Sequence, residues 1–164
     1  MREKFAAIDA PIITVGEIDE IAIDFYEGWH NDQYDFGFDR VTQWKQKVAH
    51  ARAIDIAVWC GDELAGLCWA SPQDSHDKIL VLYLQRNPDA TLATRGHIAP
   101  ICLSAVRNYA ILLELKWVVI KDPIPEAREA YFSERFKYVD GIGLAYNLTN
   151  EYAALDEQVD DNGR

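Results

Sequence analysis

The sequence predicts an α/β (α+β) fold in which a mixed sheet of about six to seven strands carries helices on both faces. Three observations predict this fold class. Two alternating apolar segments flank a short acidic turn, and a third apolar segment follows them. A long helical segment then precedes a fourth, short apolar run. This order is typical of an antiparallel meander that continues through a helix into a parallel strand.

The first third of the chain predicts one strand and two helices. A strand is expected around Ile12–Val15. Apolar residues then recur at helical spacing, which predicts an amphipathic helix. Its inner face is expected to contain Ile18, Ile21, Ala22, Phe25 and Trp29. The stretch His30–Asp39 is expected to be a loop with exposed aromatic residues. Asp39 is the expected N-cap of a second helix, with Val41, Trp44 and Val48 on its inner face.

The middle of the chain predicts the meander. The hairpin Ile54–Ala70 turns at Gly61-Asp62-Glu63, because the apolar period switches to two on either side of these residues. The next strand, Ile79–Leu84, is apolar on both faces and is therefore expected to lie centrally in the sheet.

The last third predicts a helix over His97–Leu115, a strand over Trp117–Ile120 and a helix that begins at Pro125 and runs to about Glu134. Tyr138–Leu148 is expected to be a last strand, loosened by two glycines. The 164-residue length suits one domain, so residues 1–150 are expected to form it. Residues 151–164 are expected to be an acidic, frayed tail.

Charge and composition exclude several function classes. The formal net charge of −11 disfavours binding to nucleic-acid phosphates. The chain contains neither a run of about 18 apolar residues nor a signal-peptide pattern, so no membrane association is expected. The three cysteines are expected to be reduced and the protein cytoplasmic. The histidines and cysteines lack metal-ligand spacing, so no metal is expected.

Three local features resemble the GNAT acyltransferases, which transfer an acyl group from coenzyme A to an amine. The hairpin IAVWCGDELAGLCWA resembles the family's strand, acidic turn and strand with a small residue, here Gly66. Arg95 lies where the family begins its glycine-rich pyrophosphate loop. The stretch from Ala127 to Phe136 resembles the family's fourth helix, which contains a tyrosine. The resemblance covers about residues 54–148 and implies a GNAT-like fold.

The resemblance implies an N-acetyltransferase that uses acetyl-CoA and moves the acetyl group by direct attack of a primary amine in a ternary complex. It implies that Tyr131 is the general acid that protonates the leaving thiolate. The cofactor-binding residues that it implies are Tyr83, Leu84, Gln85, Arg95, Gly96 and His97.

The amine acceptor is expected to be a small molecule or a peptide. Glu27 is the candidate general base, and Asp32 and Asp35 follow it in the sequence. Together with nearby aromatic residues, these acids favour a cationic amine. The oligomeric state stays open, with a homodimer as one alternative.

A second function is compatible with the same fold. Ile98 and Pro100 stand where the family's loop has its later glycines, and proline has no amide to donate to a phosphate. Together with the charge of −11, they favour the alternative of a catalytically inactive GNAT-fold protein that binds or inhibits a basic protein partner.

Overall fold

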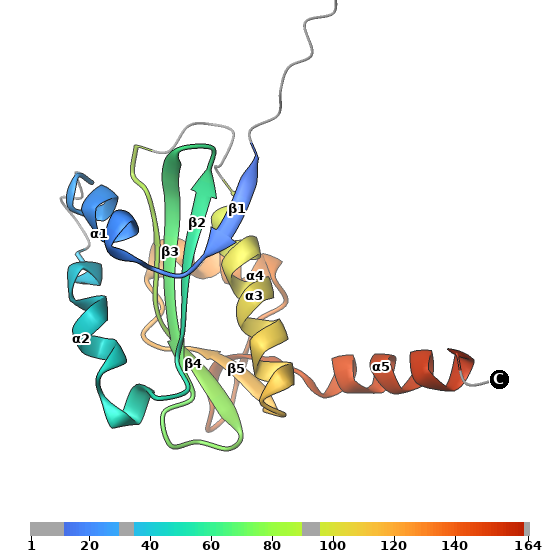
Figure 1. The fold of residues 1–164 in the computed structure, drawn as a ribbon. Coiled ribbons are helices and arrows are strands. Elements are labelled where there is room, and N and C mark those ends of the chain that lie inside the picture. Colours follow the sequence, from blue (N-terminus) through green and yellow to red (C-terminus); the bar gives the residue numbers. More distant parts are fainter. Residues whose placement is uncertain (1–11, 30–34, 90–95, 163–164) are drawn as a thin grey trace, which may run out of the picture.

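The protein, described here by a computed structural model, is built on one seven-stranded sheet with the strand order β1-β2-β3-β4-β5-β7-β6 (Figure 1). The structure describes residues 12–29, 35–89 and 96–162. Strand β4 pairs with β5 in parallel, and the other neighbouring strands are antiparallel. The predicted mixed sheet, with a meander followed by a parallel pair, is therefore confirmed.

The strands agree closely with the predicted meander and with the short apolar run after the long helix. Their bounds are Ile13–Gly16 (β1), Ile54–Cys60 (β2), Glu63–Ser71 (β3), Lys78–Arg86 (β4), Trp117–Ile120 (β5), Lys137–Val139 (β6) and Gly143–Asn147 (β7). Strand β4 lies between β3 and β5, as its apolar residues on both faces predict.

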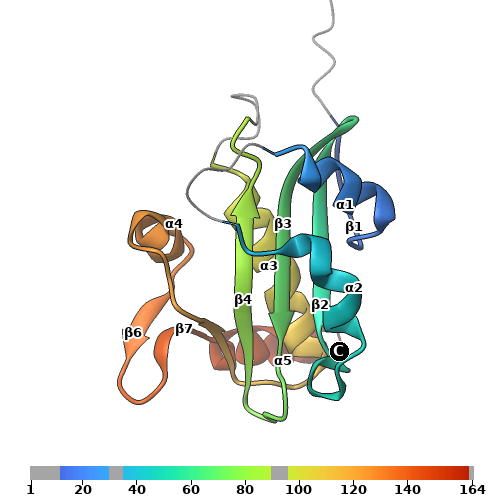
Figure 2. The same cartoon turned by 90° about the vertical axis from the view of Figure 1, so that its left-hand side faces the viewer.

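Helices cover both faces of the sheet (Figures 1 and 2). The α-helices are Glu20–Glu27 (α1), Val41–Lys45 (α2), Ile98–Leu112 (α3), Arg128–Ser133 (α4) and Thr149–Asn162 (α5). Short 3-10 helices occur at Phe38–Arg40, Val48–His50 and Pro125–Ala127. Residues of α1 and α2 pack in one core cluster with strand residues that point to one face of the sheet. Residues of α3 and α4 pack in a second cluster with strand residues that point to the other face. The sheet therefore has a core on each face.

The pairing of β4 with β5 ends halfway along β4. The parallel register runs from Lys78 beside Trp117 to Val81 beside Ile120, and the Lys121 amide donates one more hydrogen bond to the Val81 carbonyl. On the other side of β4, the register with β3 shifts by one residue, which leaves Leu82 as a β-bulge. A bulge bends and twists its strand. Beyond Val81, the second half of β4 thus runs on without a partner residue in β5.

Some inner-face predictions for the first two helices are wrong. The buried residues of the first helical segment are Ile18, Ala22 and Tyr26, whereas Ile21 is 61% exposed and Phe25 is 46% exposed. The stripe is rotated because Tyr26 packs edge-on against Phe38, with ring centroids 5.6 Å apart. Phe38 is fully buried, contrary to the predicted exposed loop aromatic.

The second helix is shorter than predicted. Val48 lies beyond the end of α2 in a separate 3-10 turn and is 92% exposed, so its predicted inner position is wrong. The residue that caps α2 is Arg40, and Asp39 lies inside the preceding 3-10 helix. The predicted N-cap role of Asp39 is therefore wrong.

The C-terminal region also differs from the prediction. The single strand expected over Tyr138–Leu148 is a hairpin of β6 and β7, because Gly141 and Gly143 adopt φ values of +76° and +110° and allow the turn. The tail expected to be frayed forms helix α5. Across the described ranges, no helix is both long enough and apolar enough to span a bilayer.

Candidate active site

A cavity of about 400 Å³ opens where β4 continues beyond its pairing with β5. Its walls come from the second half of β4, the start of α3 and the segment that leads into α4. The lining residues are Phe36, Leu84, Gln85, Arg86, Pro88, Gly96, Ile98, Ala99, Ile124, Glu126, Ala127, Ala130 and Tyr131. We call this cavity the strand-split pocket. Its volume falls in the size range of ligand pockets.

The β4 wall contains two of the three predicted strand residues. Leu84 and Gln85 line the strand-split pocket, and Gln85 is buried. The side chain of Tyr83 instead stacks on Trp44, with ring centroids 5.0 Å apart, in the core cluster of α1 and α2. Tyr83 is therefore not among the residues that line the pocket.

Arg86 is a site residue that the sequence analysis missed. It ends β4, is exposed and lines the strand-split pocket. With Glu126 it supplies the charged side chains of a mostly apolar lining. The sequence offered one indication of this role: Arg86 is a basic residue that directly follows Gln85 at the end of the apolar strand segment.

The start of α3 forms one end of the pocket. Gly96 lines it and has a φ of +80°, which glycine adopts without strain. His97 is the N-cap of α3 but makes no side-chain hydrogen bond to the helix, and it is not among the lining residues. Ile98 and Ala99 line the pocket, so their amides are in the uncapped first turn beside it. Arg95 lies outside the described residues.

Ile98 is directed into the core of the protein. It is only 3% exposed, and a Cβ atom added at Gly66 on β3 would collide with its Cγ2 atom. The missing side chain at Gly66 therefore creates the space that the isoleucine fills. Because Ile98 packs into the sheet, the strand-split pocket stays open beside it.

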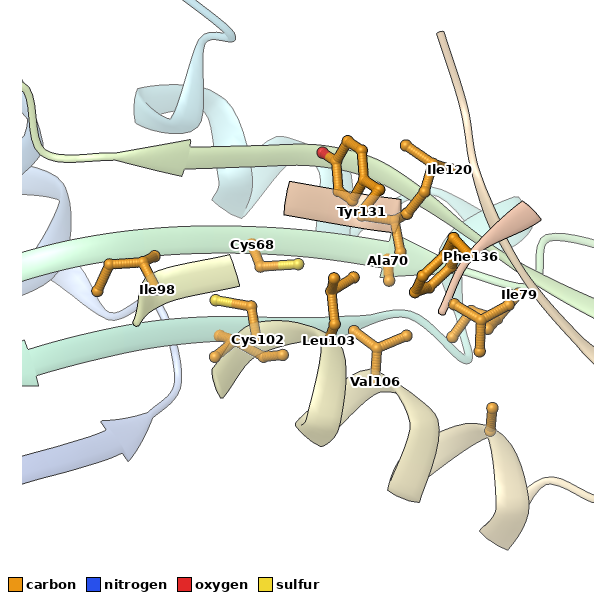
Figure 3. Close-up of a cluster of buried hydrophobic side chains, with 14 of the residues drawn as sticks. Cys68, Ala70, Ile79, Ile98, Cys102, Leu103, Val106, Ile120, Tyr131 and Phe136 are labelled. Carbon is orange, nitrogen blue, oxygen red and sulfur yellow. The ribbon is translucent and has the colours of Figure 1, made fainter. Parts of the chain in front are cut away.

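Tyr131 reaches the pocket from α4. It is 6% exposed and belongs to the core cluster on the α3 face of the sheet, so it is held by packing. In Figure 3 its hydroxyl group points away from Phe136. Burial, together with the nearby thiols of Cys68 and Cys102, raises the pKa of Tyr131 to about 12. The phenol therefore keeps its proton at neutral pH.

The end of α4 fixes this tyrosine through a Schellman motif. The Phe136 amide donates to the Tyr131 carbonyl at 3.1 Å, and the Arg135 amide donates to the Phe132 carbonyl at 3.0 Å. The rings of Phe136 and Tyr131 are in contact, with centroids 6.2 Å apart. Arg135 occupies the left-handed position with a φ of +68°, where glycine is the usual residue.

Replacing Arg135 with glycine should therefore stabilise the protein. The left-handed conformation costs a residue with a side chain about 1–2 kcal/mol, so Arg135→Gly is expected to raise the free energy of unfolding by about 1 kcal/mol. Urea denaturation followed by circular dichroism measures the change. Arg135→Ala is the control, because it removes the charge but keeps the strain. Equal stabilisation by both variants would show that the charge, and not the backbone, is responsible.

Two buried thiols lie beside the pocket wall. Cys68 on β3 and Cys102 on α3 are both fully buried and approach each other between the strand and the helix (Figure 3). The Cys102 thiol and burial raise the pKa of Cys68 well above its usual value. Cys68 therefore stays a thiol at neutral pH and is a poor nucleophile.

Glu27 lines a second pocket of about 260 Å³, which we call the acidic pocket. Its other lining residues are Tyr26, Trp29, Asp35 and Asp39. Asp35 accepts hydrogen bonds from the Tyr26 hydroxyl at 2.6 Å and from the Gly37 amide at 2.9 Å. These bonds lower the pKa of Asp35, so its carboxylate stays ionised. Asp32 lies outside the described residues.

The structure thus places Glu27 and Tyr131 in different pockets. The segment Asp35–Phe36 connects their walls, because Asp35 lines the acidic pocket and Phe36 lines the strand-split pocket. Phe36 also contacts Tyr83, with ring centroids 5.5 Å apart. The two pockets therefore share a short stretch of chain on the side of the sheet that α1 and α2 cover.

The described residues offer no group of three or more His, Cys, Asp or Glu side chains that could hold a metal ion. The two pockets offer acid–base groups, with a protonated phenol in one and carboxylates in the other.

Comparisons with known proteins agree with this geometry. No protein-family model and no curated protein sequence matches the chain. Solved structures do match it. The Campylobacter jejuni N-acetyltransferase PseH is 14% identical, with 84% of this chain and 96% of that chain covered and a TM-score of 0.54. PseH has also been solved in complex with acetyl coenzyme A.

Two further solved structures are similar over comparable lengths. The aminoglycoside 6'-N-acetyltransferase from Enterococcus faecium is 12% identical, with 82% and 97% of the two chains covered and a TM-score of 0.56. An acetyltransferase from Streptococcus agalactiae is 13% identical, with 84% and 91% covered and a TM-score of 0.56. The split between β4 and β5, the bulge in β4 and these likenesses together show that the chain has the GNAT fold.

Proposed function

We propose that this protein is an N-acetyltransferase that moves an acetyl group from acetyl-CoA to a primary amine. The observation that carries the proposal is the strand-split pocket, because it combines an unpaired edge of β4 with a protonated tyrosine. A likeness of fold alone would not support an activity.

The β4 edge suits the pantetheine arm of the donor. Beyond Val81 the strand has no β5 residue in register with it, so there is room for an extended ligand along this edge of β4. An arm with amide groups can pair with such an edge as an added strand does. Ile124, Ala127 and Ala130 form an apolar wall of the same pocket and suit the methylene groups of the arm.

The pyrophosphate of the donor would bind near the start of α3. The uncapped amides of Ile98 and Ala99 and the positive end of the helix dipole favour an anion there. Arg86 adds a positive charge from β4. Proline has no amide hydrogen, so Pro100 leaves the third position of α3 without a hydrogen-bond donor for the pyrophosphate. In this chain the positive charge of Arg86 replaces part of that missing interaction.

The reaction needs one attack and two proton transfers. The neutral amine nitrogen attacks the thioester carbonyl carbon, and the carbon–sulfur bond breaks as the tetrahedral intermediate collapses. Tyr131 gives its phenolic proton to the departing thiolate, and a carboxylate or a water takes the proton that the amine nitrogen loses. Products are the amide and the free thiol, and the tyrosine regains its proton from solvent.

Direct transfer is preferred to a covalent acyl-enzyme intermediate. Cys68 and Cys102 are close enough to Tyr131 to raise its pKa, and the raised pKa of Cys68 keeps that residue protonated. A protonated, fully buried thiol is a poor acyl acceptor. The amine is therefore expected to attack the donor itself.

The acidic pocket suits a cationic amine. Glu27, Asp35 and Asp39 place carboxylates around it, and Trp29 adds an aromatic ring. An acceptor with a second positive charge, such as a diamine or a lysine side chain, would be attracted by both groups.

Binding of acetyl-CoA tests the donor assignment. Isothermal titration should show saturable binding to the wild-type protein. Arg86→Ala should weaken it about tenfold, because a charge-assisted contact to a phosphate contributes about 1.5 kcal/mol. The matched control is Lys78→Ala, at the opposite end of β4 and outside the pocket. No heat with millimolar acetyl-CoA would refute the proposed function.

Glu27 is proposed as the carboxylate that takes the amine proton. Glu27→Gln should lower kcat/KM with a diamine about tenfold near neutral pH. This loss is smaller than is usual for removal of a general base, because water can replace an exposed carboxylate. The defect should shrink as the pH rises, since hydroxide from solvent can then take this proton in place of the missing carboxylate. Glu20→Gln, at the other end of α1, is the control. A defect that is equal at every pH would exclude the proton-transfer role.

A further inference from the structure

Helix α5 extends away from the body of the protein, as Figure 1 shows. Its first turn is anchored. The Tyr152 hydroxyl donates to the Leu115 carbonyl at 2.8 Å, and Glu151 accepts from the Tyr146 hydroxyl at 2.6 Å. Beyond these anchors, Ala153 and residues 155–158 are exposed.

An apolar groove lies where α5 leaves α3. It has a volume of about 530 Å³ and is lined by Asn108, Ile111, Leu112, Glu151, Leu155 and Gln158. Leu112 at the end of α3 is 80% exposed, and Leu155 on α5 is 46% exposed. Large exposed apolar side chains that gather in a groove are typical of an interaction surface. We call it the α3–α5 groove.

The charged side chains that α5 itself contributes beside this groove are all acidic. The sequence of α5 contains five acidic residues and no lysine or arginine. Asp156 and Glu157 are exposed and directly follow Leu155, and Glu151 lines the groove itself. A partner that buries the two leucines would therefore meet several carboxylates at the rim.

The part of α5 beyond its first turn would gain stability from a partner. An isolated helix of this length is marginal in water, because most helical stability comes from packing of an apolar face. The last turn of α5 contains no basic residue that could interact with the negative end of the helix dipole. A positively charged partner would supply both the packing and the missing positive charge.

We propose that the α3–α5 groove binds a basic amphipathic helical segment of a partner protein. Such a segment would place apolar side chains on Leu112 and Leu155 and lysines or arginines beside the α5 acids. A second copy of this chain is disfavoured, since each copy has a net charge of −11 and brings an equally acidic α5. The inference is independent of the proposed acetyl transfer, because the groove shares no residue with the strand-split pocket.

The probe is a fluorescein-labelled peptide with leucines at helical i, i+3, i+4 and i+7 spacing and lysines elsewhere. Fluorescence anisotropy should show saturable binding to the full-length protein that weakens with salt. The double variant Leu112→Asn/Leu155→Asn should bind at least about tenfold more weakly. Hydrogen exchange of the amides in 149–158 should slow when the peptide is added.

Matched controls separate this groove from general attraction to an acidic protein. Val48→Asn replaces another exposed apolar residue, at 92% exposure, and should leave binding unchanged. Asp156→Asn/Glu157→Gln should weaken binding, whereas Glu20→Gln/Asp24→Asn on α1 should not. All variants should retain the thermal midpoint of the wild type, because the replaced side chains are exposed.

Three results would overturn the proposal. The first is no binding of the lysine peptide, or equal binding of a peptide whose lysines are replaced by glutamates. The second is equal weakening by the α1 and α5 charge variants. The third is a dimer in analytical ultracentrifugation that Leu112→Asn/Leu155→Asn converts to a monomer, which would make a second copy the occupant.

Discussion

Tyr131→Phe is expected to lower kcat for acetyl transfer by about 10²- to 10³-fold while acetyl-CoA binding stays unchanged. The variant loses only the phenolic hydroxyl, so the ring still packs in the core beside Phe136 and the Schellman motif still ends α4. Without that proton the thiolate must leave unprotonated. Initial rates of thiol release with a diamine acceptor, together with titration of acetyl-CoA, give both quantities.

The same change elsewhere provides the control. Tyr138→Phe removes a hydroxyl from a residue that is 57% exposed on β6, outside the strand-split pocket, and should leave kcat unchanged. If Tyr131→Phe retained wild-type turnover, the acid would have to be another group, and the proposed role of Tyr131 would be wrong.

The pKa of Tyr131 gives this assignment a pH signature. An ordinary tyrosine loses its proton around pH 10, whereas burial raises the pKa of Tyr131 to about 12. The raised pKa means that the protonated form persists to higher pH. The kcat of the wild type should therefore not fall between about pH 8 and about pH 10 through loss of this proton.

Much of the fold could be predicted because the strands have clear period-two patterns. The hairpin of β2 and β3, the central position of β4 and the bounds of β5 follow from where apolar residues alternate or run continuously. The long helix α3 was also predicted, since it is apolar on most sides and lies against the sheet. In these elements the local pattern and the tertiary environment agree.

The first helix was harder because two of its faces are apolar. Ile21 and Phe25 fit the inner stripe as well as Tyr26 does, and the face that is buried depends on Phe38 and on the strand residues of the same core cluster. Phe25 instead packs edge-on against Trp59, with ring centroids 5.2 Å apart. A periodic pattern cannot choose between two such stripes, because the choice depends on residues far along the chain.

The site was predictable only in part. The sequence pointed to the edge of β4, to the start of α3 and to Tyr131, and the structure brings Leu84, Gln85, Gly96 and Tyr131 into one pocket. Sequence patterns could not show that the side chain of Ile98 turns into the space at Gly66, since those residues are 32 positions apart. Nor could they place Arg86, whose role depends on where β4 separates from β5.

The contact between Gly66 and Ile98 leads to the largest expected effect on stability. Gly66→Ala places a methyl group against the Cγ2 atom of Ile98, in a core where both residues are packed between β3 and α3. Overpacking of this kind costs typically about 1–3 kcal/mol, and we expect a loss near the upper end because Gly66 is also close to the Gln85 backbone. Acetyl-CoA binding should weaken as well, since a displaced α3 moves the amides of its first turn.

A double-mutant cycle tests whether this contact is the cause. Ile98→Ala alone should cost about 2–4 kcal/mol through the cavity that it leaves. In Gly66→Ala/Ile98→Ala the added methyl group meets no Cγ2 atom, so the combined loss should be smaller than the sum of the single losses by at least about 1 kcal/mol. Gly16→Ala on β1, where an added Cβ contacts nothing within 4 Å, should change stability by less than about 0.5 kcal/mol. Strictly additive losses in the cycle would show that Gly66 is required for some reason other than the close approach of Ile98.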